Sequence, residues 1–161
     1  MMPGRHATVS LGVGLLGWWW SRSPATLPLS LVVGTLVDLD HVADYLWYAL
    51  VKEHRLILPL HAYELAFPLW WTVRQHLGQR AAIVVVASYL LHLLSDELEN
   101  RTKPGACSLI WRLVNGFRIE SLSRDPVAGM QGRREDLDRL KRLVSRLRGA
   151  PSGRRDAADS G

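Results

Sequence analysis

The chain has 161 residues, a length that favours one domain followed by a tail. Apolar residues make up 48% and charged residues 22%, so the chain is too apolar to be disordered throughout. Its single cysteine, Cys107, excludes an intramolecular disulfide bond and a cysteine-based zinc finger. The net charge of +5 is uneven, because residues 1–100 carry six Lys or Arg against eight Asp or Glu, and residues 101–161 carry fourteen against seven. A basic C-terminal segment suits anionic lipid or nucleic acid better than a buried core.

The N-terminal half is predicted to form apolar helices. Residues 5–22 are one helix-length apolar stretch, and two interpretations are open for it. A basic start before an apolar centre is typical of a signal peptide, whereas three consecutive tryptophans are typical of an anchor at a membrane interface. Residues 25–51 are expected to be helical over most of their length.

The central apolar segments differ in regularity. Residues 53–76 are interrupted by Pro59 and Pro68, which predict breaks or kinks in the helix. Residues 79–100 are rich in Ala, Leu and Glu and give the cleanest helical pattern of the chain.

The C-terminal third is more polar. Residues 100–108 are a predicted loop, and residues 109–122 fit either a short helix or a strand. Residues 133–149 are predicted to form an amphipathic helix, and residues 150–161 a disordered tail. This pattern predicts a helical domain over residues 1–120, a basic helical segment over 121–149, and the tail. The basic helix has no aromatic residues for base stacking, so nucleic acid is not expected as a partner, and membrane lipid is.

Two environments are possible for the apolar helices. No segment is an uninterrupted run of about 20 apolar residues, because His61 and Glu64 interrupt one candidate and His92 another. The helices are therefore either buried in a soluble bundle or placed in a membrane with their ionisable groups facing one another. Residues 81–94 offer almost no polar outer face, and the tryptophans cluster near the ends of apolar runs, which favours the membrane. We expect an all-α, membrane-associated helical bundle whose basic C-terminus is cytoplasmic.

Ionisable side chains occur in pairs within these apolar segments. Three segments each carry a histidine three or four residues from a carboxylate, a spacing that puts both on one helical face: Asp38 with His41, His61 with Glu64, and His92 with Asp96. An uncompensated charge in an apolar interior is costly, and no Lys or Arg lies inside these motifs. A divalent metal would resolve the imbalance, and histidine with carboxylate suits zinc first, or manganese or iron.

The stretch around Asp38 and Asp40 raises a geometric question. Two residues turn a regular α-helix by about 200°, so both carboxylates face one ion only if the backbone is irregular there. We therefore expect a break, with the helix restarting near His41. The alternative is that Asp38 or Asp40 is the N-cap of that helix.

Four stretches taken in order resemble one protein family. "RHATVSLGVGLL", "GTLVDLDHVADYL", "HRLILPLHAYELA" and "ASYLLHLLSDELEN" are similar to the bacterial membrane-bound metal-dependent hydrolases. That family includes LexA-regulated inner-membrane proteins and is distantly similar to zinc-dependent phospholipase C. The resemblance covers roughly residues 4–120. The third stretch departs from the family pattern, because His54 and Arg55 match its start but His61 lies two positions later than expected.

The resemblance implies a site and an activity. The expected metal ligands are His6, Asp38, Asp40, His61, His92 and Asp96. Glu64 has no counterpart in the family, but as a carboxylate three residues from His61 it is expected, with His41 as the alternative, to be the catalytic base. His54 and Arg55 are expected as supporting residues behind the ligands. The implied function is metal-dependent hydrolysis of a phosphoester or lipid-like substrate at the bacterial inner membrane by a multi-pass protein. The alternative is a non-catalytic membrane protein with a structural metal or a buried polar network.

Overall fold

The computed structural model describes residues 3–100 and 102–149, so the predicted tail lies outside the described residues. Within that part of the chain there is no β-strand, and two isolated β-bridges accompany the helices. The prediction of an all-α fold is confirmed.

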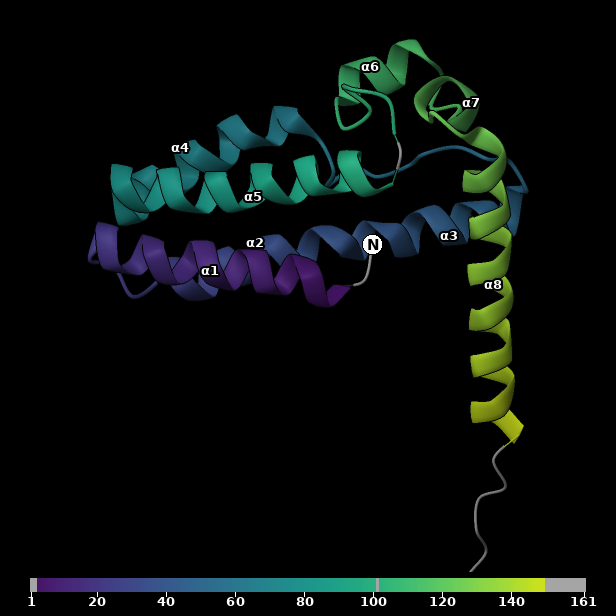
Figure 1. Ribbon diagram of the computed structural model, residues 1–161, viewed down its shortest axis with the longest axis horizontal. Helices are drawn as coiled ribbons and strands as arrows, with labels where there is room; N and C mark the ends of the chain where they lie inside the picture. The colour runs from purple at the N-terminus through teal and green to yellow at the C-terminus, as the bar shows by residue number, and fades with distance from the viewer. Residues whose placement is uncertain (1–2, 101, 150–161) are drawn as a thin grey trace, which may run out of the picture.

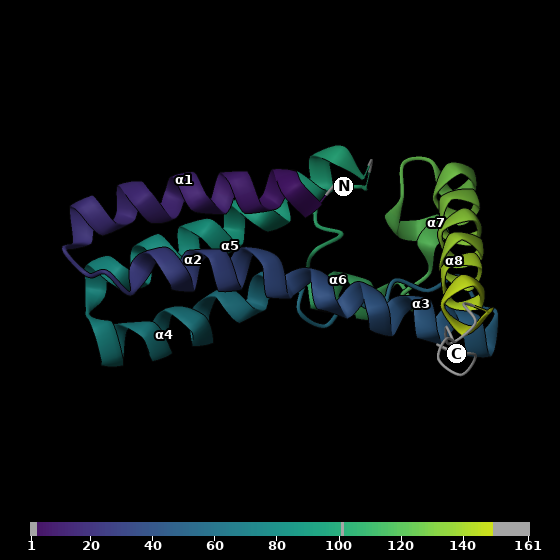
Figure 2. The same ribbon diagram turned by 90° about the horizontal axis from the view of Figure 1, so that it is seen from below.

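Four helices lie side by side and form the body of the molecule (Figures 1 and 2). They are α1 (Pro3–Ser21), α2 (Thr26–Leu36), α4 (Ala66–Leu77) and α5 (Gln79–Glu99). In Figure 1, α4 and α5 lie over α1 and α2, and α5 contacts the other three helices. Because α5 is the central helix, it buries residues along most of its length, from Ala81 to Asp96.

A short 3₁₀ segment joins α2 to the next helix. It covers Val37–Leu39 and is followed at once by α3 (Asp40–Val51), which extends past the other bundle helices (Figure 2). A 3₁₀-helix turns about 240° over two residues, so Asp38 and Asp40 diverge by about 120°, less than the 160° of an α-helix. The predicted irregularity is confirmed. The N-cap alternative is wrong, because no side chain caps either helix start.

An irregular segment connects α3 to α4. Lys52 ends α3 in the left-handed region at φ 62°, and a 3₁₀ turn (Tyr63–Leu65) precedes α4. Pro59 lies within the irregular segment, as predicted. Pro68 is the third residue of α4, where a missing backbone N–H costs nothing, so this proline does not break the helix.

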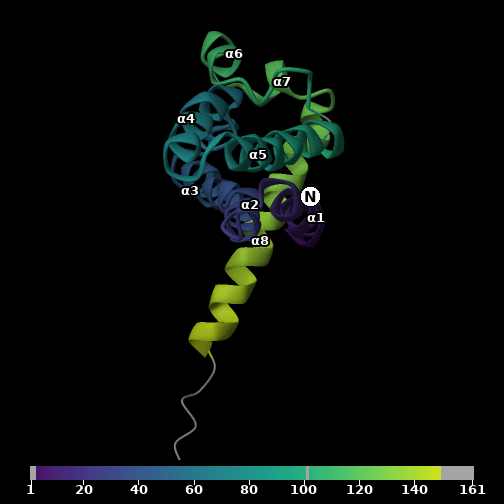
Figure 3. The ribbon, with the colours of Figure 1, turned by 90° about the vertical axis from the view of Figure 1, so that its left-hand side faces the viewer.

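The C-terminal third folds over one end of the bundle. Residues 109–122, left open between helix and strand, form α6 (Leu109–Val114) and α7 (Ile119–Leu122). The last described helix, α8 (Pro126–Gly149), crosses the end of α3 and leads away from the bundle (Figures 1 and 3). The N–H of Leu56 donates to the carbonyl of Phe117 over 2.8 Å, which ties the irregular segment to this layer.

Glycine allows α1 to pack closely against α5. A Cβ built at Gly17 would lie 2.1 Å from Cγ1 of Val84, whereas one at Gly12 would have no atom within 4 Å. Small residues at helix contacts are the usual packing device of membrane helices. Substitutions at these two glycines therefore distinguish the effect of close helix packing, at Gly17, from that of helix propensity, at Gly12.

Gly17→Leu is expected to destabilise the bundle by about 1–3 kcal/mol, because α1 must move away from α5. The measurement is the thermal unfolding midpoint of the purified protein. Gly12→Leu is the matched control and should leave the midpoint unchanged or raise it, since leucine is a better helix former than glycine. An equal drop in both variants would contradict the packing argument.

Two helical stretches are long and apolar enough to cross a membrane, Thr26–Val51 and Gln79–Glu99. Large apolar side chains are also exposed on several helices of the bundle: Leu16, Leu50, Phe67, Leu94 and Leu98 are examples. The outer surface of the bundle is therefore unusually apolar for a helical protein in water.

Candidate metal centre

Polar side chains gather inside the bundle near the C-terminal end of α5. His92 and Asp96 continue the buried stripe that Val85 and Ser88 begin on this helix. Their spacing of four residues puts both on the same face. The 3₁₀ segment contributes Asp38, while the irregular segment before α4 contributes His61.

Four atoms from these residues lie close together, and we call them the four-atom cluster: His61 Nε2, His92 Nε2, Asp38 Oδ1 and Asp96 Oδ2. The two imidazole nitrogens are 3.2 Å apart. Asp96 Oδ2 lies 2.8 Å from His61 Nε2 and 3.4 Å from His92 Nε2. Asp38 Oδ1 lies 3.4 Å from His92 Nε2 and 3.8 Å from His61 Nε2.

These separations fit the donor set of a divalent metal. Zinc bonds to histidine and carboxylate are about 2.0–2.2 Å long, so neighbouring ligands of a tetrahedral ion are about 3.3–3.6 Å apart. The distances of the four-atom cluster bracket that range. Two histidines and two carboxylates are also a donor set that zinc, manganese and iron accept.

His6 extends the group from α1. Its Nε2 lies 3.2 Å from Asp96 Oδ1, without the geometry of a hydrogen bond, and its ring lies 4.0 Å from that of His92. The side chain is buried, and its Nε2 has no hydrogen-bond partner among the described residues. A buried imidazole nitrogen that faces carboxylate oxygens without a hydrogen bond fits a metal ligand better than a packing residue.

Asp40 was predicted as a metal ligand, but its carboxylate contacts the far side of the His61 ring and the backbone instead. Its Oδ1 lies 2.9 Å from His61 Nδ1, and its Oδ2 accepts the backbone N–H groups of Leu60 and His61 over 2.8 and 3.1 Å. Both carboxylate oxygens are therefore engaged away from the four-atom cluster. A carboxylate that contacts one ring nitrogen of a histidine fixes the orientation of the ring, and Asp40 does this for His61.

His41 lies at the edge of the group. Its Nδ1 is 3.5 Å from Asp40 Oδ1 and 3.9 Å from Asp38 Oδ1, and its ring stands edge-on to His61. The side chain is 33% exposed, which makes it the most accessible histidine of the group. Its Nδ1 is buried and has no hydrogen-bond partner among the described residues, so the exposed part of the ring is its other atoms.

Glu64 lies elsewhere, and its prediction as a catalytic base is corrected. Its carboxylate accepts hydrogen bonds from the Ser108 hydroxyl and from the backbone N–H groups of Leu109 and Ile110. It thereby caps the first turn of α6. Desolvation raises the pKa of Glu64, but these hydrogen bonds outweigh it and lower the pKa to about 2. A carboxylate with so low a pKa is a poor proton acceptor at neutral pH.

The capping role of Glu64 predicts acid sensitivity. A depressed pKa in the folded protein adds stability that is present above the unfolded pKa and is lost as the pH falls towards about 2. Glu64→Gln is expected to cost about 1 kcal/mol at pH 7 and to flatten the loss of stability between pH 5 and pH 2. Unfolding curves of both proteins across that range test this. Parallel curves would contradict it.

His54 and Arg55 also lie away from the group, which corrects their predicted supporting role. The His54 ring stacks on Tyr48 at 4.5 Å. The exposed guanidinium of Arg55 pairs with Glu53 at 2.7 Å. Neither side chain contacts a residue of the four-atom cluster, because the chain turns between positions 55 and 61.

Two residues that the sequence reasoning missed hold the segment that carries His61. The buried Arg112 of α6 donates from Nη1 to the carbonyl of Leu58 over 2.6 Å and from Nη2 to the carbonyl of His61. The hydroxyl of Tyr89 contacts the carbonyls of Leu60 and Ala62, both at 2.7 Å. A lone arginine within the apolar run "LIWRLV" was the available signal for Arg112.

An ion pair fixes α8 beside the site. Asp44 is buried and pairs with the buried Arg133 of α8. Asp44 Oδ1 also accepts the N–H of Ile57 over 2.9 Å, and Arg133 Nη1 donates to the carbonyl of Arg55 over 2.7 Å. The basic C-terminal third thus contributes directly to the walls around the site.

Comparison with protein-family models found no match, and comparisons with curated proteins and with solved structures found none either.

Proposed function

We propose that the protein is a membrane-embedded hydrolase that depends on a divalent metal ion, most simply zinc, and acts on a phosphoester or lipid-like substrate. The observation that supports this most is the convergence of two imidazole nitrogens and two carboxylate oxygens from three separate segments. The resemblance to membrane-bound metal-dependent hydrolases includes Asp38, His92 and Asp96 of this cluster, whereas His61 departs from the pattern of that family.

In this proposal the residues have distinct roles in metal binding, orientation and proton transfer. His6, Asp38, His92 and Asp96 offer ligand atoms that all lie within 4.8 Å of one another, and His61 contacts both His92 and Asp96, so these residues would hold the ion. A bound divalent ion lowers the pKa of water and polarises a phosphoryl oxygen. Asp40 keeps His61 oriented through Nδ1, and His41 replaces Glu64 as the proton acceptor because it is accessible and adjoins the group. Arg112 holds the segment that carries His61 through hydrogen bonds to the carbonyls of Leu58 and His61.

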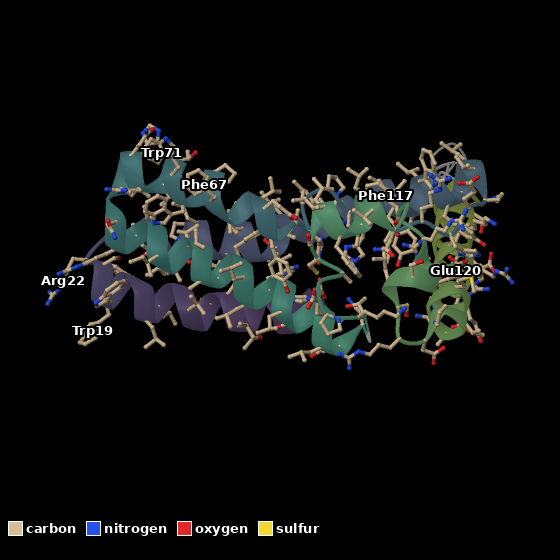
Figure 4. All side chains as sticks on the ribbon, turned by 90° about the horizontal axis from the view of Figure 1, so that it is seen from above. Trp19, Arg22, Phe67, Trp71, Phe117 and Glu120 are labelled. Carbon is tan, nitrogen blue, oxygen red and sulfur yellow. The ribbon has the colours of Figure 1, made fainter. Side chains whose placement is uncertain are left out.

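The apolar exterior supports a position in the membrane. Besides the two apolar helical stretches, tryptophan and arginine gather at one end of the bundle, where Figure 4 shows Trp19, Arg22 and Trp71. Arg80 lies over the ring of Trp20 at 5.9 Å. Interfacial belts have this composition. Phe117 and Glu120 mark the opposite end.

The metal centre then lies near the second interface. Asp96 follows Arg80 by sixteen residues, which is about 24 Å along α5 and close to the thickness of the hydrocarbon core. The described part of the basic C-terminal third lies at this same end, and the positive-inside rule favours the cytoplasmic side for it. Together with the family resemblance, this supports a multi-pass protein of the bacterial inner membrane. A substrate at headgroup level would reach the site from this end.

A non-catalytic role is the second candidate, and one observation favours it. His61 contacts Asp40 through Nδ1 and Asp96 through Nε2, so its ring is fully hydrogen-bonded without an ion. A buried polar network of this kind can stabilise a bundle by itself.

The test uses the full-length protein purified in detergent. We expect tight binding of a divalent ion and hydrolysis of a chromogenic phosphodiester that a chelator abolishes and zinc restores. A protein that neither retains nor takes up metal would overturn the proposal. Tight metal binding with no turnover of phosphodiesters or carboxylic esters would favour the structural role.

A further inference from the structure

A cavity of about 260 Å³ adjoins the metal centre. His61 and Asp96 form part of its wall, so it borders the four-atom cluster directly. Gly129 and Gly132 of α8 form another part, and Arg112 a third. The cavity therefore lies between the bundle and the C-terminal layer, at the end of the molecule where α8 crosses α3.

The charge in this cavity is unbalanced. Arg112 is 1% exposed, and its guanidinium contacts carbonyl oxygens, with no carboxylate within ion-pair distance among the described residues. Asp40 and Glu64 act on it only through space. The two carboxylates that line the cavity are already matched, since Asp44 pairs with Arg133 and Asp96 contacts histidines. A buried unpaired cation is costly unless an anion compensates it.

The guanidinium of Arg112 also has N–H groups beyond those used in its hydrogen bonds to carbonyl oxygens. Nη1 and Nη2 each carry two N–H groups, and one hydrogen bond is made by each nitrogen. The planar fork of arginine matches a phosphate better than a point charge does. A volume of 260 Å³ equals that of roughly nine water molecules, which accommodates a phosphate with a small alcohol but not a whole lipid.

We propose that this cavity binds the phosphate group of the substrate ester, with Arg112 as its binding residue and the first turns of α8 as a wall. The inference rests on the proposed function, because the bound group would lie against the metal centre. A soluble phosphate ester and a phospholipid headgroup present the same chemistry to this cavity.

Gly132 provides the means to close the cavity without touching the metal centre. A Cβ at this position would have no atom within 4 Å, and the residue lies in a helix, where a side chain is tolerated. Gly132→Trp should therefore fill the cavity in a folded protein. Gly132→Ala is the matched control, because it has the same backbone effect and adds only a methyl group.

The experiment measures binding of inorganic phosphate to the zinc-loaded full-length protein by calorimetry, with zinc content determined on the same samples. Gly132→Trp is expected to weaken phosphate binding by roughly tenfold or more at unchanged zinc content, and Gly132→Ala to leave it near wild type. Arg112→Lys should also weaken it, because lysine lacks the fork. Displacement of phosphate by glycerol phosphate alone would identify a soluble ester, and displacement by phosphatidylglycerol in mixed micelles a lipid headgroup.

The possible failures are distinguishable. Zinc-loaded Gly132→Trp protein that binds phosphate as tightly as wild type would overturn the cavity assignment and leave the metal proposal standing. Wild-type protein that binds no zinc would overturn both.

Discussion

Asp96→Asn is expected to reduce zinc affinity by roughly two orders of magnitude or more, the largest effect of any single substitution at the centre. Asp96 contacts three histidines: its Oδ1 lies 3.2 Å from His6 Nε2, and its Oδ2 lies 2.8 Å from His61 Nε2 and 3.4 Å from His92 Nε2. Asparagine keeps the shape but removes the charge that a divalent ion requires. Competition with a chromogenic chelator measures the affinity.

Two further variants make this prediction specific. Asp40→Asn should weaken zinc binding by a smaller factor, about 10–100-fold, because Asp40 orients His61 without joining the four-atom cluster. Glu97→Gln is the control on the same helix, since that carboxylate accepts the N–H of Cys107 instead. The metal assignment fails if Asp96→Asn and Glu97→Gln bind zinc equally well.

Arg133→Met is expected to destabilise the fold by about 3–5 kcal/mol, because it leaves the charge of Asp44 buried without its partner. The Asp44→Asn/Arg133→Met double variant should recover most of that loss, since no unpaired charge remains. Chemical unfolding in detergent, followed by circular dichroism, gives the free energies of unfolding.

The same pair tests how α8 is attached. Arg133 also donates to the carbonyl of Arg55, so its loss should loosen α8 from the segment that leads to His61. Arg134→Met is a suitable control, because the neighbouring side chain is exposed. If the single and double variants are equally unstable, the ion pair is not what holds α8, and its docking depends on other contacts.

Local patterns in the sequence predicted much of the fold. Apolar runs and helix-forming residues predicted α1, α2, α3 and α5. On a regular α-helix Asp38 and Asp40 are about 200° apart, and the expectation that both face one site predicted the irregular backbone that appears as a 3₁₀ segment. The spacing of His92 and Asp96 likewise put both on one face of α5. These features depend on residues within one or two helical turns, so the chain order contains them.

Only the tertiary structure assigned the side chains to their tasks. Glu64 and Asp40 look equivalent in the sequence, but folding puts the first on the start of α6 and the second on His61. Arg112 reaches the carbonyl of His61 across 51 positions, and Arg133 reaches Asp44 across 89. Contacts at such separations leave no periodic pattern in one sequence. The sequence by itself determined that histidines and carboxylates enter the apolar bundle in pairs such as His92 with Asp96. Tertiary packing decided which groups meet and which basic residues join them, because burial leaves each charge only the partners that other segments bring to it.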